Sequence, residues 1–153
     1  MAHLITPIEI DGLPRCCQPA IRRTEAILAG AANELAPDKW EIYLAYQDGT
    51  TKHGSVKFGI CCATRISITL NGMIETLNSG YDWIEVLHNG QRVFFHESAD
   101  TSEDPDETVA AGPFVVVVAL EDRPCGHIIE IRGSTGDGIA NNYVWWQAAV
   151  AIS

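Results

Sequence analysis

The sequence predicts an all-β fold, an antiparallel β-sandwich or jelly-roll-like domain of about eight strands. Segments with alternating apolar and polar residues recur from residue 39 onward, and turn-forming pairs such as Asn89-Gly90 separate them. The spacing of these segments is short and fairly even, and no regular alternation of strands with helices is visible. Because each such strand has one apolar face, a second sheet is expected to cover it.

The length of 153 residues corresponds to one domain, so we expect a single β-sandwich over residues 1-153, with residues 1-19 as an extended N-terminal arm. The next segment, residues 20-36, fits two structures. Leu28 and Leu35 lie on one helical face that a following proline would end. Leu28 and its alternate neighbours also fit one side of a strand. Both a short helix and a strand are therefore retained for this segment.

The first three predicted strands, residues 40–46, 56–60 and 65–70, have an apolar residue at every second position. Asp48-Gly49 supplies a turn after the first of them, and Asn71-Gly72 is expected to end the third. Strands of this kind place one face in a core and leave the other in contact with solvent.

The next three strands differ in how they are recognised. Residues 81–87 and 91–96 flank Asn89-Gly90, which is the clearest hairpin signal in the chain. The run from Phe114 to Leu120 is continuously apolar and rich in β-branched residues. Such a run is expected of a strand that is covered on both faces.

Residues 128–131 and 144–152 are the last two predicted strands, and a glycine-rich loop from Gly133 to Asn142 joins them. Adjacent residues of a strand point to opposite faces of the sheet. Trp146 shares its face with two valines and is expected in the core, so Trp145 points outward.

The outward aromatic residues provide a candidate ligand site. Tyr143 and Trp145 could stack on a sugar ring, and the amide groups of Asn141 and Asn142 could hydrogen-bond its hydroxyls. We therefore predict these four residues as ligand-binding. The alternative is that the aromatic side chains pack beneath a loop or the second sheet.

The segment from residue 97 to 107 contains six carboxylates, which could hold a cation. Calcium takes about six to eight oxygen ligands, and carboxylates clustered on a loop can supply them. Asp100, Asp104 and Asp106, with Asp137 of the glycine-rich loop, are the predicted metal ligands, and no other cofactor is expected. The spacing does not match an EF-hand, and the alternative is a solvated loop whose like charges keep the strand edge from pairing.

The charge balance limits the classes of partner. Ten Lys and Arg residues against 20 Asp and Glu residues give a net charge of -10. Nucleic acids and anionic membrane surfaces are bound mainly through basic residues, so neither is expected as a partner. The longest apolar run, from Pro113 to Leu120, is far shorter than the ~20 residues of a membrane helix. The N-terminus lacks the features of a signal peptide, so we expect synthesis in the cytoplasm.

The five cysteines occur as two adjacent pairs, Cys16-Cys17 and Cys61-Cys62, together with Cys125. An odd number cannot close completely into disulfides within the chain. Buried thiols are favoured, and one or two disulfides or a metal site are the alternatives. Thiols would agree with a reducing compartment.

No catalytic signature accompanies these features, so we do not expect an enzyme. The sequence has no nucleophile elbow, no HExxH helix and no phosphate-binding loop. Four of the five histidines are scattered along the chain, at His53, His88, His96 and His127.

Residues Tyr81 to Val86, followed by Asn89-Gly90, resemble the aromatic and acidic strand and turn of CUB-like sandwich domains. The resemblance covers one strand and its turn, and the spaced cysteines that such domains usually carry are absent. It implies a sandwich fold and no particular function.

The expected function is that of a non-enzymatic structural or binding module that works by assembly. A virus or phage particle component, such as a capsid decoration protein or a tail-associated adhesin, would suit a compact acidic β-sandwich without a leader. Its partner would be another protein or further copies of this chain, on the exterior of the particle. The alternative is a carbohydrate-binding module that binds a glycan with the help of calcium.

Overall fold

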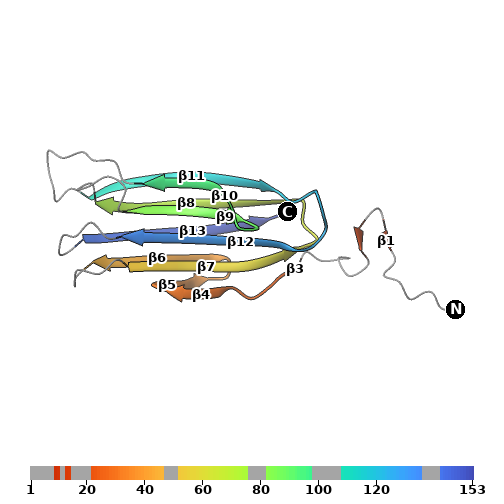
Figure 1. Cartoon of the computed structure of the whole chain (residues 1–153), viewed down its shortest axis with the longest axis horizontal. Coiled ribbons are helices and arrows are strands. Elements are labelled where there is room, and N and C mark those ends of the chain that lie inside the picture. Colours follow the sequence, from red (N-terminus) through yellow and green to blue (C-terminus); the bar gives the residue numbers. More distant parts are fainter. Residues whose placement is uncertain are drawn as a thin grey trace.

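The structure is a computed structural model that describes residues 9–10, 13–14, 22–46, 52–75, 82–97, 108–135 and 142–153. These residues form strands and turns, and no helix occurs among them. Two antiparallel sheets pack face to face as a β-sandwich (Figure 1), so the predicted all-β class is confirmed. In the described part of the chain there is accordingly no helix that could span a membrane.

The first sheet is named the β12 sheet after its central strand. Its order is β10-β9-β12-β7, and β7 pairs on its other side with both β3 and β4. Because β3 and β4 pair with successive stretches of β7, together they act as one interrupted edge strand. The strands of this sheet are β3 (Arg22–Arg23), β4 (Ile27–Gly30), β7 (Lys52–Cys61), β9 (Trp83–His88), β10 (Gln91–Glu97) and β12 (His127–Thr135).

The second sheet, named the β13 sheet, has the order β11-β8-β13-β6-β5. Its strands are β5 (Ala32–Ala36), β6 (Lys39–Tyr46), β8 (Arg65–Glu75), β11 (Thr108–Ala119) and β13 (Asn142–Ile152). Two further short strands, β1 (Glu9–Ile10) and β2 (Leu13–Pro14), pair with each other and join neither sheet. The single domain over 1-153 and the arm over 1-19 remain predictions.

The described part of this segment contains the three short strands β3, β4 and β5 and no helix, so the strand alternative is confirmed and the helix is wrong. Gly30 has a φ of 62°, and a Cβ at this position would lie 2.1 Å from the carbonyl oxygen of His53. Only glycine tolerates both the positive φ and this close approach. The turn after Gly30 lets β4 pair with β7 of one sheet and β5 with β6 of the other, which is why the segment is extended.

Alternate residues of the central strands form one core between the sheets. Trp40, Leu44 and Trp146 are each at most 1% exposed, which confirms Trp146 as a core residue. The Trp146 indole lies over Gly72, where a Cβ would be 2.5 Å from the ring. Gly72 therefore makes room for the indole within a continuous β8, and the prediction that Asn71-Gly72 ends this strand is wrong.

The eight strands predicted from residue 40 onward are all present, as β6 to β13. The hairpin prediction is also confirmed, because Asn89 and Gly90 join β9 to β10 with φ values of 51° and 81°. The predicted loop from Gly133 begins too early, since β12 continues to Thr135. The strand extends to Thr135 because this residue is buried, and its hydroxyl donates a hydrogen bond to the buried carboxylate of Asp82.

The favoured prediction was that all cysteines are thiols, and the structure differs from it. Cys61 carries a free thiol, whereas Cys62 is disulfide-bonded. Disulfides persist in oxidising environments, so the cysteines do not support the expected reducing compartment.

Candidate functional site

Among the predicted ligand-binding residues, the structure describes the side chain of Trp145 alone. Trp145 is half-buried on the outer face of the β13 sheet, beside Tyr43 of β6 and Met73 of β8. Its outward direction agrees with the prediction, because Trp146 points into the core. Asn141 lies outside the described residues, and of Asn142 and Tyr143 only their place in β13 is described. A ligand site on these four residues remains a prediction.

The predicted metal ligands Asp100, Asp104, Asp106 and Asp137 all lie outside the described residues. Within the part that is described, no group of three or more His, Cys, Asp or Glu side chains could hold a metal ion. Calcium binding by the acidic segment is therefore still a prediction.

Strand β11 provides the first candidate site. It lies at one end of the β13 sheet and, among the described strands, pairs on one side only, with β8. Its inward residues Val116 and Val118 are buried, whereas Val115 and Val117 are 62% and 55% exposed. The prediction that this run is covered on both faces is therefore wrong, because nothing in the described chain covers its outer face.

The lack of charge on β11 makes this exposure unusual. Edge strands are commonly protected from pairing with other chains by charged side chains or by their short length. Residues 108 to 119 include no charged side chain, and the strand is 12 residues long. On the neighbouring edge strand β10, Val93 and Phe95 are also exposed. These four residues of β10 and β11 (Val93, Phe95, Val115 and Val117) are named the β10/β11 edge.

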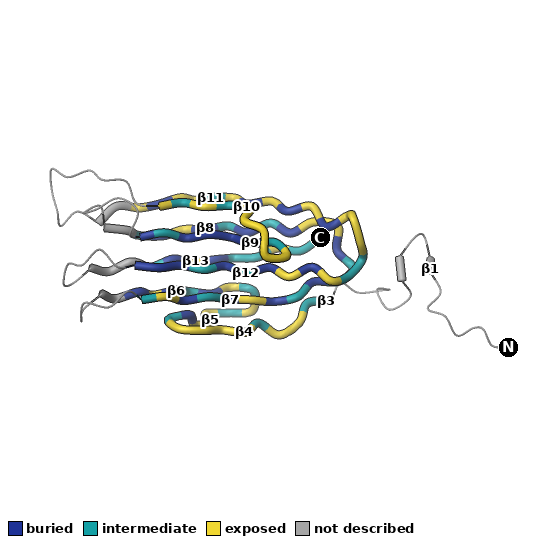
Figure 2. The backbone as a smooth tube through the Cα atoms, viewed as in Figure 1, coloured by how far each residue is buried: buried dark blue, intermediate teal, exposed yellow. Residues whose placement is uncertain are grey.

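The opposite lateral side of the sandwich also exposes apolar side chains. There β4 and β5 form the outermost strands of the two sheets (Figure 1). Most of β4 and β5 is coloured as exposed in Figure 2. Ile27 is 67% exposed, Leu35 is 51% exposed and Leu28 is also exposed. These three residues are named the β4/β5 edge. Exposed apolar side chains thus occur on the outermost strands at both lateral sides of the sandwich.

A second candidate site lies on the outer face of the β12 sheet, around Glu85. This side chain points outward from β9, yet only 3% of it is exposed, because two arginines cover it. Arg132 donates from Nε and Nη2 to Glu85 Oε1, at 2.8 and 2.5 Å. Arg92 donates from Nε to Oε2 at 2.7 Å, and its guanidinium lies 4.3 Å from the centre of the Phe95 ring. Two cations therefore share one anion, which leaves the group with one positive charge.

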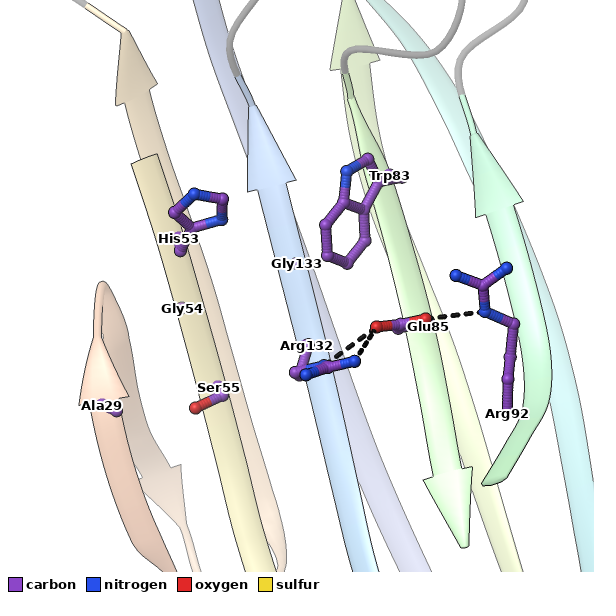
Figure 3. A pocket seen from close by; sticks show the side chains of 9 residues that line it. All are labelled: Ala29, His53, Gly54, Ser55, Trp83, Glu85, Arg92, Arg132 and Gly133. Carbon is purple, nitrogen blue, oxygen red and sulfur yellow. Dashed lines mark hydrogen bonds and ion pairs between the residues drawn. The ribbon is translucent and has the colours of Figure 1, made fainter. Parts of the chain in front are cut away.

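A cavity of about 500 Å³ opens beside this group (Figure 3). Trp83 of β9 lies on one side of the cavity and His53 of β7 lies on the other. The backbone of Gly54 and Gly133, which are paired across β7 and β12, forms the floor. The remaining lining is completed by Ser55, Ala29 and the Glu85 group.

Sequence reasoning missed the Glu85 group. The hairpin turn at Asn89-Gly90 places Arg92 beside β9, so the ion pair between Glu85 and Arg92 could have been predicted from the hairpin. Arg132, which is opposite Glu85 on β12, follows 47 residues later in the sequence. No sequence signal placed β12 next to β9, and the ion pair between Glu85 and Arg132 was therefore not predictable.

Two histidines form a separate contact at the end of the sandwich. His88 Nε2 lies 2.9 Å from His127 Nδ1, and the Nε2 atom of the buried His127 lies 2.8 Å from the carbonyl oxygen of Arg123. The rings are stacked, with centroids 5.2 Å apart. The hydrogen bonds of this pair go to each other and to the backbone, as expected of a structural contact.

The histidines should make the fold sensitive to mild acid. Burial, and then the neighbouring His127, lowers the pKa of His88, and burial lowers the pKa of His96. The unfolded chain takes up protons near the ordinary pKa of 6.5, whereas the folded protein takes them up only at lower pH. Stability should therefore be constant above about pH 6.5 and fall as the pH drops below it.

Denaturant unfolding measured at a series of pH values from about 7.5 to 5.5 checks this expectation. The double variant His88→Gln with His96→Gln should show a flatter dependence than wild type. An equally steep dependence in both proteins would assign the acid sensitivity to other groups.

Comparison with known proteins gives partial structural likeness only. No protein family model and no curated protein matches the chain. Among solved structures, the chain is similar to the VP2 subviral particle of infectious bursal disease virus, with 17% identity over 86% of this chain and 33% of that chain and a TM-score of 0.37. The Gx strain of the same virus gives 18% identity over 84% and 32%, with a TM-score of 0.39. The Gt strain gives 17% identity over 84% and 32%, with a TM-score of 0.35.

The chain spans about a third of the length of these structures. A likeness at such TM-scores transfers no function. The function must follow from the described surfaces of this chain.

Proposed function

We propose that this chain is a non-enzymatic structural module that assembles with further copies of itself into a larger particle. A virus or phage particle, with the chain as a decoration protein or tail-associated adhesin on its exterior, is the setting that we propose. The exposure of β11 is the observation that carries the proposal. This strand has apolar residues on both faces, and the described chain covers only one of them. A second copy is the occupant that we assign to its exposed face.

The position of the two edges supports contact between identical chains. The β10/β11 edge and the β4/β5 edge lie on opposite lateral sides of the sandwich (Figure 1). When two different patches of one chain meet between copies, the contact is heterologous and repeats into a ring or a lattice. Burying one exposed valine completely contributes about 1.5–3 kcal/mol, so several such side chains must be buried together to offset the roughly 4–15 kcal/mol that association costs.

Light scattering over a concentration series tests the proposal. Wild type should have a mass that is a multiple of 16.7 kDa and that rises with concentration. The double variant Val115→Lys with Val117→Lys should remain at the mass of one chain, because lysine removes the apolar contact and adds charge at an edge. The double variant Ile27→Lys with Leu35→Lys should do the same from the opposite side.

A control is Gln147→Lys, which adds one positive charge at an exposed position of the central strand β13. It should assemble like wild type. A wild-type protein that stays at one-chain mass at every concentration, or an oligomer that neither edge variant dissociates, would overturn the proposal.

A further inference from the structure

We propose that the cavity beside Glu85 binds an acidic sugar residue, that is, a pyranose ring with a carboxylate. The carboxylate is bound by Arg92 and Arg132, and the ring lies against Trp83. None of the residues that line this cavity belongs to the two named assembly edges, although the Arg92 guanidinium contacts Phe95 of the β10/β11 edge. The cavity also differs from the sugar site expected around Trp145, which lies on the other sheet.

The first observation that supports this site is that Arg92 and Arg132 have unused hydrogen-bond donors. Each guanidinium has five N–H groups in a fixed plane. Arg92 uses only its Nε and Arg132 uses Nε and Nη2, so within the described chain both terminal nitrogens of Arg92 and Nη1 of Arg132 have no hydrogen-bond partner. The two side chains are 56% and 43% exposed, and both line the cavity. Glu85 fixes their orientation while leaving donors for a second carboxylate.

Charge is the second support. The chain has a net charge of -10, so an anion is repelled from most of its surface. The Glu85 group is an exception, since it combines two cations with one anion. Arginine binds a carboxylate through paired N–H donors, which gives a carboxylate an advantage over a neutral group at this place.

The shape of the cavity favours a ring over a small free anion. Trp83 provides an aromatic wall on which the apolar face of a sugar can stack (Figure 3). His53 and Ser55 stand opposite Trp83 and can hydrogen-bond hydroxyl groups. A volume of about 500 Å³ lies within the range typical of small-molecule sites.

Calorimetric titration of the full chain tests the site. Glucuronic acid and N-acetylneuraminic acid are the probes, and glucose is the neutral counterpart of glucuronic acid. At least one of the two acids should bind saturably, and glucose should bind at least about tenfold more weakly, because it offers no partner to the arginines. If neither acid binds wild type, the proposal is overturned.

Variants of the lining identify the binding residues. Arg92→Gln should weaken binding of the acid about tenfold or more, and Trp83→Leu should also weaken it. Arg92→Gln keeps the Glu85 to Arg132 pair, so the variant should fold, which thermal unfolding verifies. Lys57→Gln is the matched control, since it removes an exposed cation of β7 that does not line the cavity.

Three outcomes would count against the proposal. Equal binding of the acid by wild type and both lining variants would place the ligand elsewhere. If Lys57→Gln weakened binding as much as Arg92→Gln, the effect would come from the overall charge of the surface and not from a contact with Arg92. Binding of acetate or inorganic phosphate as tight as that of the sugar acids would show an anion site without a sugar.

Discussion

The variant Trp146→Ala is expected to lose about 3–5 kcal/mol of unfolding free energy, because a tryptophan buried in a core leaves a large cavity when it is truncated. Trp146 is 1% exposed and lies over Gly72. Its ring also approaches His96 and Phe114, with centroid distances of 6.0 and 6.5 Å. Truncation therefore removes contacts with β8, β10 and β11 at once.

The adjacent tryptophan is the matched control for this prediction. Trp145 differs from Trp146 mainly in the face of β13 to which it points, and it is half-buried. Trp145→Ala should cost about 1–2 kcal/mol, since water already reaches part of the side chain. Urea denaturation of both variants measures the difference. Equal losses would contradict the assignment of the two faces.

The second large effect is expected at Glu85. Glu85→Gln should lower the unfolding free energy by about 2–3 kcal/mol, because a buried carboxylate that accepts bonds from two arginines is replaced by a neutral amide. The arginines are partly exposed, so water compensates some of the lost interaction. This partial compensation keeps the expected loss below that of a fully buried ion pair.

Arg92→Gln is the comparison for Glu85→Gln. Its side chain is 56% exposed, and its removal leaves Glu85 bonded to Arg132. The loss should be at most about 1 kcal/mol, as is usual for an exposed ion pair. Denaturation midpoints and slopes for the two variants provide the measurement. A Glu85→Gln variant as stable as Arg92→Gln would mean that the carboxylate does not hold this part of the sheet together.

Local sequence patterns determined most of the secondary structure. The alternation from Trp40 to Tyr46 and the Asn89-Gly90 turn each predicted an element correctly, because pleating and turn geometry depend on residues that are neighbours in the chain. The outward and inward directions of Trp145 and Trp146 followed from the same alternation. Of the predicted sites, only Trp145 has a described side chain, so the sites themselves remain predictions.

Elements whose structure depends on distant partners were not predictable from the sequence. Asn71-Gly72 has the composition of a turn, but Gly72 lies within β8 because the distant Trp146 occupies the space above it. The run from Phe114 to Leu120 has an apolar pattern on both faces, and only the sheet order places it at an edge.

The candidate sites depend on the tertiary structure in the same way. Arg132 meets Glu85 because β12 inserts between β9 and β7, although residues 85 and 132 are far apart in the chain. The sequence by itself determined the strands, the hairpin and the faces of the side chains. The order of strands decided which apolar face is exposed and which charges share a cavity, because cross-strand neighbours are set by packing between distant segments rather than by local conformational preference.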